Sequence, residues 1–189
     1  MEAMTAILGR RTTPPAMMVG PEPEPAIVDR LLEAACAAPD HGKLRPWRFL
    51  LVRREARARL GQLCATALAA EQPGMDAAEQ EKHRTGPTRA PLIIVAIASL
   101  RPDHPKIPAI EQIAAAAAAT QNLLVAAEAH GIVVKWATGK PAYSEGVKAG
   151  LGLTADEQIL GFLYLGRANG ETLQPNRRPM PASVATEWP

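Results

Sequence analysis

The spacing of apolar and polar residues along the 189-residue chain predicts a mixture of helices and short strands. Helices are predicted over residues 2–9, 25–38, 55–70, 109–130 and 142–150. Strands are predicted over residues 47–52, 92–98, 132–136 and 159–165. The first two are short, strongly apolar runs and are expected to be largely interior. A chain of this length and pattern is expected to fold as a single domain, residues 1–189.

Three stretches show no such periodicity. Residues 14–25 are a proline-rich connector. Residues 71–89 are polar and punctuated by Pro73-Gly74 and Gly86-Pro87, so we expect a mobile lid or excursion there. Residues 167–189 carry four prolines and several charges, which predicts an arm that either hangs free or lies across another subunit.

The longest predicted helix, residues 109–130, contains six consecutive alanines at 114–119 and stops at Gly131. Small side chains permit close backbone approach on several faces, so we place this helix centrally. Together with the proline-rich arm it also offers more surface than one subunit easily hides. We therefore expect an obligate dimer.

Composition and charge remove several classes of function. Lys and Arg number 21 against 19 Asp and Glu, and aromatic residues are only 4%, which disfavours a nucleic-acid partner. The longest apolar run, residues 90–98, falls well short of the roughly 20 residues that a membrane span needs. Two cysteines outside any CxxC pair predict free thiols in a reducing compartment. A cytoplasmic protein without a membrane partner is expected.

The motifs of the common enzyme classes are missing. Gly139-Lys140 does not belong to a P-loop, because Val134 and Pro141 occupy positions that need glycine and a hydroxyl residue. The sequence has neither a GxGxxG nor a GxSxG motif, and the four histidines show no metal-ligand spacing. No metal site and no catalytic side chain are therefore predicted. An enzyme of this sequence would take its chemistry from a cofactor.

Three local features each admit a functional and a plain interpretation. Arg10-Arg11-Thr12 could grip a phosphate bidentately, or could be two solvated arginines. The polar loop in residues 38–47 could bind a ligand, or could simply connect a helix to a strand. Trp136-Ala137-Thr138-Gly139 stands at a strand end where open sheets expose ligand-facing loops, or is an ordinary turn with a core Trp.

Taken in order, these features resemble the nitroreductase family of flavin-dependent oxidoreductases, and in particular its short YdjA-like branch. The resemblance covers residues 2–170. It rests on an ordered set of motifs: Arg10-Arg11-Thr12, Ala38-Pro39, Asp40-His41-x-Lys43, Pro46-Trp47-Arg48-Phe49, Ala90-Pro91-Leu92, the small-residue helix, Trp136, and Gly161–Gly166. No single motif is specific, but the set is.

The resemblance implies an α+β, nitroreductase-like three-layer fold, with a mixed, mainly antiparallel central sheet flanked by helices, in an intertwined homodimer. It also implies FMN held at the dimer interface and NAD(P)H as electron donor. Carried over residue by residue, the implied cofactor-binding positions are Arg10, Arg11, Thr12, His41, Trp136, Ala137, Thr138 and, by a looser match, Arg178.

The implied roles differ along this set. Arg10, Arg11 and Thr12 would hold the phosphate and ribityl chain, and Arg178 would also contact the phosphate. His41 would reach a flavin bound mainly by the partner subunit, and Trp136–Thr138 would line the ring. Residues 126–131 align with the region implicated in nicotinamide-nucleotide binding. Two positions depart from the branch pattern: Ala37 replaces a frequent Arg, and Arg45 replaces the more usual Gln.

The activity implied by the resemblance is hydride transfer from NAD(P)H through flavin N5 to a small-molecule acceptor, a nitroaromatic or a quinone, by a ping-pong mechanism. Two alternatives stay open from the residues alone. One is a flavoprotein of the same fold with a specialised oxidation or dehalogenation reaction. The other is a flavin-binding protein without turnover.

Overall fold

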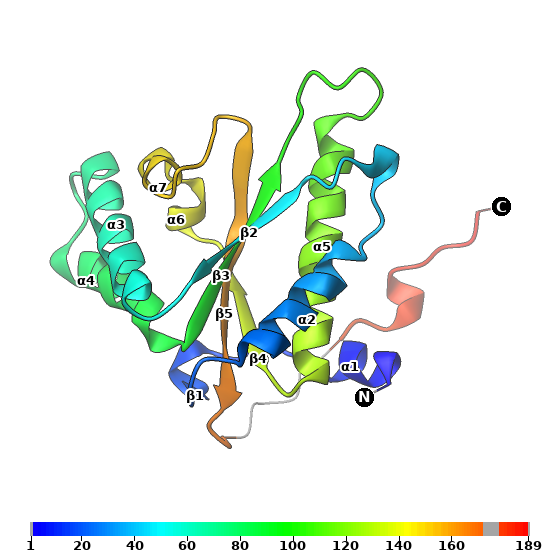
Figure 1. Cartoon of the computed structure of the whole chain (residues 1–189), viewed down its shortest axis with the longest axis horizontal. Helices are drawn as coiled ribbons and strands as arrows, with labels where there is room; N and C mark the ends of the chain where they lie inside the picture. The colour runs from blue at the N-terminus through cyan, green and yellow to red at the C-terminus, as the bar shows by residue number, and fades with distance from the viewer. Residues whose placement is uncertain (1, 172–177, 189) are drawn as a thin grey trace.

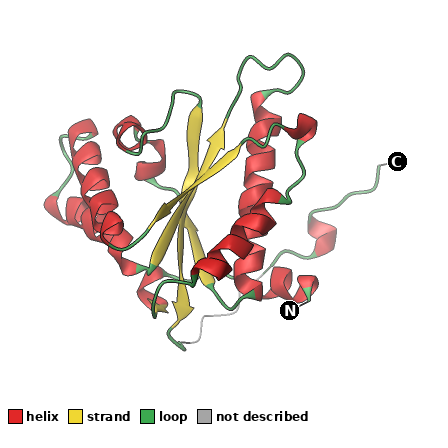
Figure 2. Ribbon diagram, viewed as in Figure 1, coloured by secondary structure: helices red, strands yellow, loops and turns green. Residues whose placement is uncertain are grey.

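The computed structural model describes residues 2–171 and 178–188 and consists of one twisted sheet between two layers of helices (Figures 1 and 2). The strands are β1 (Met18–Val19), β2 (Trp47–Val52), β3 (Leu92–Ser99), β4 (Val133–Ala137) and β5 (Glu157–Ala168). The α-helices are α1 (Ala3–Gly9), α2 (Pro25–Cys36), α3 (Glu55–Glu71), α4 (Ala77–Thr85), α5 (Ala109–Ala129), α6 (Lys140–Tyr143) and α7 (Glu145–Gly150). This α+β architecture confirms the predicted fold class.

Every strand pair of the sheet is antiparallel. The strand order is β1-β5-β3-β2, and β4 also pairs with β5. Residues Leu92–Ala98 of β3 are buried throughout, since β3 lies between β5 and β2 with a helical layer on each face. The prediction of an interior strand here is confirmed.

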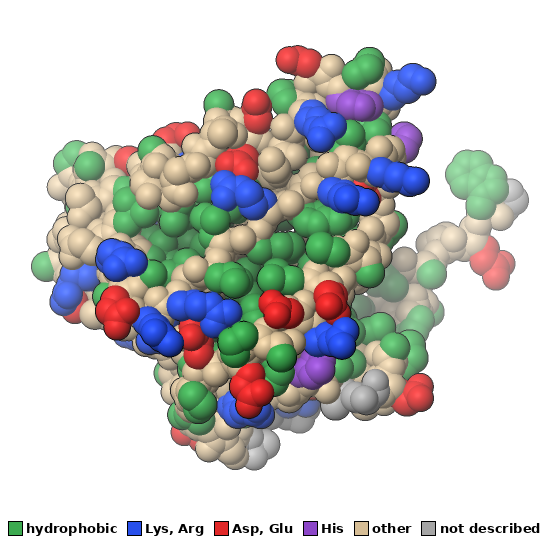
Figure 3. Space-filling view, viewed as in Figure 1, with side chains coloured by type: hydrophobic (Ala, Val, Ile, Leu, Met, Phe, Trp, Pro, Cys, Tyr) green, Lys and Arg blue, Asp and Glu red, His purple; other side chains and the backbone are tan. Residues whose placement is uncertain are grey.

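The prediction that residues 47–52 form a largely interior strand is wrong. β2 pairs with β3 alone and forms one edge of the sheet, and its residues are mostly half-buried, with Leu51 39% exposed. Figure 3 shows apolar side chains exposed over this edge, between the two helical layers. The apolar run of β2 resembles that of β3, so composition alone did not separate an edge strand from a central one.

Two hydrophobic cores lie on opposite faces of the sheet. One core joins α2 and α5 to the sheet through residues such as Leu31, Leu123 and Leu163. The other joins α3 and α7 to the sheet through residues such as Leu60, Val147 and Phe162. Helix α5 buries Ala116, Ala119 and Ala127 fully, which lets its backbone approach α2 and the sheet closely. Gly131, the predicted stop of this helix, has a φ of 67°.

The segment 71–89 forms α4 and a 3-10 turn (Gly86–Arg89) rather than an irregular excursion. Asp76 caps α4 by accepting a hydrogen bond from the Glu79 amide at 2.7 Å. Helix α4 packs against α3 at Gly61, where a Cβ atom would lie 1.9 Å from the Arg84 carbonyl oxygen. This close backbone contact requires glycine. The mobility expected of the segment stays a prediction.

Candidate functional site

The N-terminal segment that carries the double arginine runs beside the free edge of β4. Thr12 forms a parallel bridge with Val134, and the Thr13 amide donates to the Val134 carbonyl oxygen at 3.2 Å. The C-terminal arm returns to the same place, since Arg178 donates to the carbonyl oxygens of Leu8 (3.0 Å) and Arg10 (2.9 Å). The structure therefore brings together Arg10, Arg11, Thr12 and Arg178.

Arg11 lines a pocket of ≈ 360 Å³ at this edge. Its other walls come from the end of α1, from β4 and from the last residues of β5, and they include Gly9, Glu128, Val133 and Asn169. A Cβ atom on Gly9 would lie 3.3 Å from Glu128 Oε1, so α1 sits directly against the C-terminal end of α5. The double-arginine segment is thus fixed at this end of α5.

A second pocket lies at the other end of β4 and has a volume of ≈ 440 Å³. It contains Ala137 and Thr138 at the strand end, with Tyr164 of β5 behind them. Its basic side chains come from four elements: Lys82, His83, Arg89, Lys135 and Lys140. We call it the cation pocket. Such a concentration of positive charge favours a ligand that carries negative charge.

One carboxylate, Glu79, partly balances this charge. Lys140 Nζ donates to Glu79 Oε1 and to Gln72 Oε1, both at 2.7 Å, and the hydrogen bond from Lys140 lowers the pKa of Glu79. Burial lowers the pKa of His83, which lies 3.9 Å from Glu79. At neutral pH the pocket therefore owes its charge to its lysines and arginine.

A small cavity of ≈ 60 Å³ continues beneath the cation pocket and reaches Leu60, Cys64 and Phe162. Burial raises the pKa of the Cys64 thiol to about 11 and that of Tyr164 to about 12. Both groups are neutral at physiological pH, so neither supplies a nucleophile or a base. The floor of the cation pocket therefore carries no charge and has a structural role.

The structure places Trp136 on the opposite side of the sheet from its neighbour Ala137. Side chains alternate along a strand, so Lys135 and Ala137 face the α4 layer while Val134 and Trp136 pack with the α2–α5 core. The Trp136 indole donates from Nε1 to the Leu160 carbonyl oxygen at 2.9 Å. Its side chain is not brought into the cation pocket, and this part of the predicted site stays untested.

His41 lies at the far end of α5, away from the other predicted residues. Its Nδ1 is 2.7 Å from Glu111 Oε2, in the first turn of α5. Glu111 and Glu128 lie seventeen residues apart on this helix, which corresponds to about 26 Å at the helical rise. His41 and the double-arginine segment therefore lie at opposite ends of α5.

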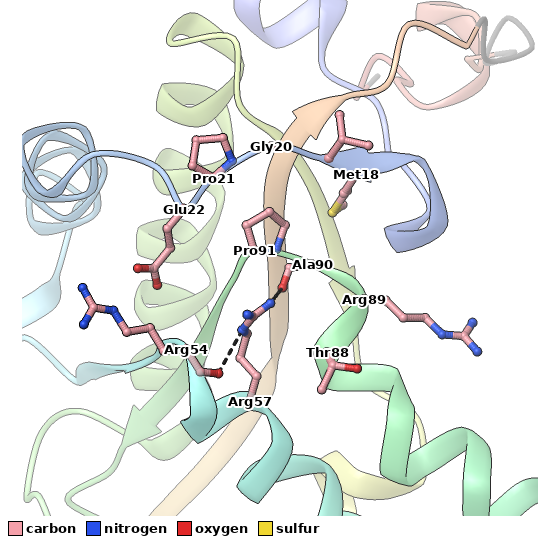
Figure 4. Close-up of a pocket in the computed structure, with 11 residues that line it drawn as sticks. Met18, Gly20, Pro21, Glu22, Arg54, Arg57, Thr88, Arg89, Ala90 and Pro91 are labelled. Atoms are coloured by element: carbon pink, nitrogen blue, oxygen red, sulfur yellow. Dashed lines mark hydrogen bonds between the residues drawn. The ribbon is translucent and has the colours of Figure 1, made fainter.

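The most voluminous of the described pockets, ≈ 520 Å³, contains none of the predicted residues. It opens between β1 and the starts of α3 and β3 (Figure 4). Arg54 and Arg89 extend away from each other, and Arg57 lies between them, bonded to the carbonyl oxygens of Arg54 and Ala90 (Figure 4). The three guanidinium groups that line this pocket do not converge on one point, so the pocket is not a candidate site for the cofactor.

Two other kinds of site can be assessed directly. Among the described residues, no cluster of three or more His, Cys, Asp or Glu could hold a metal ion. Within residues 2–171 and 178–188, no helix has both the length and the apolar character needed to cross a bilayer.

Sequence reasoning missed most of the cation pocket. Lys82 and His83 belong to the segment expected to be a mobile lid, so no fixed position was expected for them. Lys135 could have been found, because alternation along the predicted strand 132–136 sets it on the same face as Ala137. Glu111 carried no local signal, since its contact with His41 spans 70 residues.

Comparison with known proteins gives consistent results. The model of the nitroreductase family matches residues 19–167. YdjA of Escherichia coli (strain K12), a candidate NAD(P)H nitroreductase, is 32% identical over 166 residues, which cover 88% of each protein.

Solved structures agree with this match. A nitroreductase-like family protein from Bacillus cereus superposes with a TM-score of 0.82 at 22% identity, covering 99% of this chain and 95% of that one. The FMN and NADPH-dependent nitroreductase NfnB of a Sphigopyxis strain gives a TM-score of 0.79 at 21% identity, covering 100% and 99%. The chain belongs to the nitroreductase family.

Proposed function

We propose that this protein is an FMN-dependent oxidoreductase that uses NAD(P)H to reduce nitroaromatic or quinone-type acceptors. The observation that carries the proposal is the continuity between the double-arginine segment and the cation pocket along β4. Val134, beside Thr12, and Thr138 are four residues apart, which is about 13 Å in a strand. A ligand with a phosphate at one end and a ring at the other fits this arrangement.

The residues present suit FMN. Arg10, Arg11 and Arg178 supply guanidinium groups at the end where the phosphate would lie, and Thr12 supplies a hydroxyl. At the other end, the cation pocket offers Lys82, Lys135 and Arg89 around Ala137 and Thr138. The dependence of NfnB on FMN and NADPH, at 21% identity, supports the same assignment.

When bound, the flavin supplies hydride transfer at N5. The double-arginine segment would bind the phosphate, and the cations of the cation pocket would orient the ring and favour negative charge on it. Tyr164 and Cys64, neutral at physiological pH, line the cavity under the cation pocket and would take no part in proton transfer. No side chain of the described site is assigned the role of a dedicated acid or base.

We further propose a homodimer. His41 lies about 26 Å along α5 from the level of Arg11, so it can contact only a flavin that another subunit holds. Large apolar side chains are also exposed on the N-terminal helix, the start of α5 and the arm: Leu8 (60%), Ile110 (70%), Met180 (73%) and Trp188 (95%). Light scattering that finds a folded, flavin-loaded monomer would contradict this proposal.

In the proposed dimer, one open side of each flavin site would serve both the donor and the acceptor. The two substrates then bind in turn, and double-reciprocal plots are expected to be parallel, with each substrate competing against the other at high concentration. Intersecting lines, with product inhibition that requires a ternary complex, would contradict the ping-pong mechanism but not the flavin site.

The proposal is tested first by the absorption spectrum of the purified protein and by titration with FMN. Oxidation of NADH and NADPH is then followed with a nitroaromatic and with a quinone. Protein that neither retains nor takes up FMN would refute the proposed function. Tight FMN binding without turnover of any acceptor would support the flavin-binding alternative.

A further inference from the structure

The His41 side chain is held by a single carboxylate. Nδ1 of His41 lies 2.7 Å from Glu111 Oε2, although the two side chains remain 62% and 46% exposed. They border a pocket of ≈ 320 Å³ whose floor is the small-residue face of α5 at Ala114 and Ala118. The other ring nitrogen, Nε2, stands on the opposite side of the imidazole from this bond and is the atom available to a ligand.

The loop that carries His41 has an unusual backbone. Gly42, Lys43 and Arg45 have φ values of 71°, 55° and 49°, and two of these three residues are not glycine. The Arg45 amide donates to Asp40 Oδ2 at 2.6 Å, which closes the loop. Backbone of this kind costs free energy and persists where the surroundings determine it, as at ligand sites.

The first turn of α5 is equally well fixed. Gln112, next to Glu111, is 1% exposed and accepts a hydrogen bond from the Arg101 amide at 2.8 Å. Its Nε2 donates to the carbonyl oxygens of Arg101 and Ile107. Ile107 in turn contacts the loop, since a Cβ atom on Gly42 would lie 2.5 Å from Ile107 Cδ1. Glu111 is thus presented to His41 by a rigid support.

We propose that Glu111 is a positioning residue. Its carboxylate accepts the Nδ1 proton of His41 and so fixes both the ring orientation and the tautomer, leaving Nε2 as an acceptor toward the flavin of the partner subunit. A carboxylate can only accept, so this hydrogen bond requires the proton on Nδ1. The inference rests on the proposed function, because it names a residue that serves the same flavin site.

The first test measures the tautomer of His41 without flavin, by nitrogen-15 NMR of histidine-labelled protein at a pH above which the His41 signals no longer change. Wild-type protein is expected to show the Nδ1–H form, and Glu111→Ala the Nε2–H form that free imidazole favours. The control is Glu145→Ala, another exposed first-turn glutamate, which should leave the His41 signal unchanged. A His41 tautomer that is unchanged in Glu111→Ala would overturn the proposal.

The second test is a double-mutant cycle on FMN affinity. Glu111→Ala should weaken FMN binding roughly tenfold, the effect of a lost hydrogen-bonded orientation. In the His41→Ala background the same change should have no further effect, because Glu111 acts only through His41. Equal weakening in both backgrounds would overturn the positioning role. If wild-type protein binds no FMN, the flavin role fails with the proposed function, while the tautomer result still decides the His41–Glu111 relation.

Discussion

The cation pocket and the His41 loop are built in different ways for the same proposed ligand. The cation pocket draws its charged side chains from α4, β4, α6 and the turn before β3, which all line the same pocket. The His41 loop has three residues with positive φ and depends on a few specific hydrogen bonds. The cation pocket supplies positive charge, and the His41 loop supplies an imidazole in a fixed orientation. The His41 loop lies at the N-terminal end of α5, whereas the cation pocket lies beside α4 on the other face of the sheet. In the proposed homodimer, each flavin site would take these two regions from different copies of the chain.

The largest effect on the cation pocket is expected from a substitution that separates α4 from α3. Gly61→Val places a branched side chain where even a Cβ atom would lie 1.9 Å from the Arg84 carbonyl oxygen. We expect the free energy of unfolding to fall by about 3 kcal/mol, the upper range for overpacking. Tryptic cleavage at Lys82 and Arg84 should also rise.

The control for this variant is Gly74→Ala, because a Cβ atom there meets nothing within 4 Å. Urea unfolding and limited proteolysis of both variants check the prediction. The His41 tautomer should stay unchanged in Gly61→Val, since the loop lies on the other face of the sheet. Unaltered stability of Gly61→Val would show that α4 is not held at this contact.

The next largest effect concerns the double arginine. Loss of one charge-assisted phosphate contact costs about 1.5–3 kcal/mol, so Arg11→Ala should bind FMN roughly ten- to a hundredfold more weakly and purify largely colourless. The fold should remain intact by circular dichroism. Arg10→Ala tests the neighbouring position. Stoichiometric FMN in both variants would rule out the phosphate assignment.

The sequence predicted where the helices and strands lie along the chain better than it predicted which elements pack against each other. The apolar run of β3 and the small-residue helix α5 were found because burial on several faces leaves a continuous pattern. β2 has a similar run but lies at an edge, since strand order depends on pairings between distant segments. The prediction for residues 71–89 recognised their polarity and missed α4, whose position depends on a tertiary contact at Gly61.

The candidate site was predictable to the extent that its parts are local in sequence. Arg10–Thr12 and Ala137–Thr138 stand beside one strand, and the structure sets them along it. Side chains alternate along a strand, so Trp136 lies on the opposite face from Lys135. The Trp136 motif alone does not show on which face its side chain lies. Glu111 and Lys82 depend on contacts between segments far apart in the chain, which a single sequence does not reveal.

The His41 loop can be broken through its backbone. Gly42→Ala forces a side chain onto a residue with a φ of 71° and toward Ile107. We expect a loss of about 1–2 kcal/mol in unfolding free energy, because alanine is strained in this conformation. The His41 tautomer should become mixed. Gly20→Ala is the matched control, with a similar φ of 89° but open space around it and no contact with His41.

The smallest expected change in stability concerns β2, the edge strand that follows the His41 loop. Arg48 of β2 donates to both oxygens of Glu157 of β5, at 2.7 and 2.8 Å, and the Glu157 side chain is only 7% exposed. The hydrogen bond from Arg48 is the main cause that lowers the pKa of Glu157 from its ordinary 4.5. A lowered folded-state pKa stabilises the fold above that ordinary value, and this stability is lost as the pH falls through the folded-state pKa.

Glu157→Gln should therefore lower the free energy of unfolding at pH 7 by about 1 kcal/mol, a modest value because Arg48 is partly exposed. Below the ordinary pKa of 4.5 the difference between wild type and variant should shrink, because the unfolded chain takes up a proton on Glu157 more readily than the folded protein does. Urea midpoints at several pH values check both statements, and Glu145→Gln, an exposed carboxylate, should show neither effect. A difference that stays constant down to pH 3 would mean that the lost packing, and not the ion pair, holds the β2 edge beside the His41 loop.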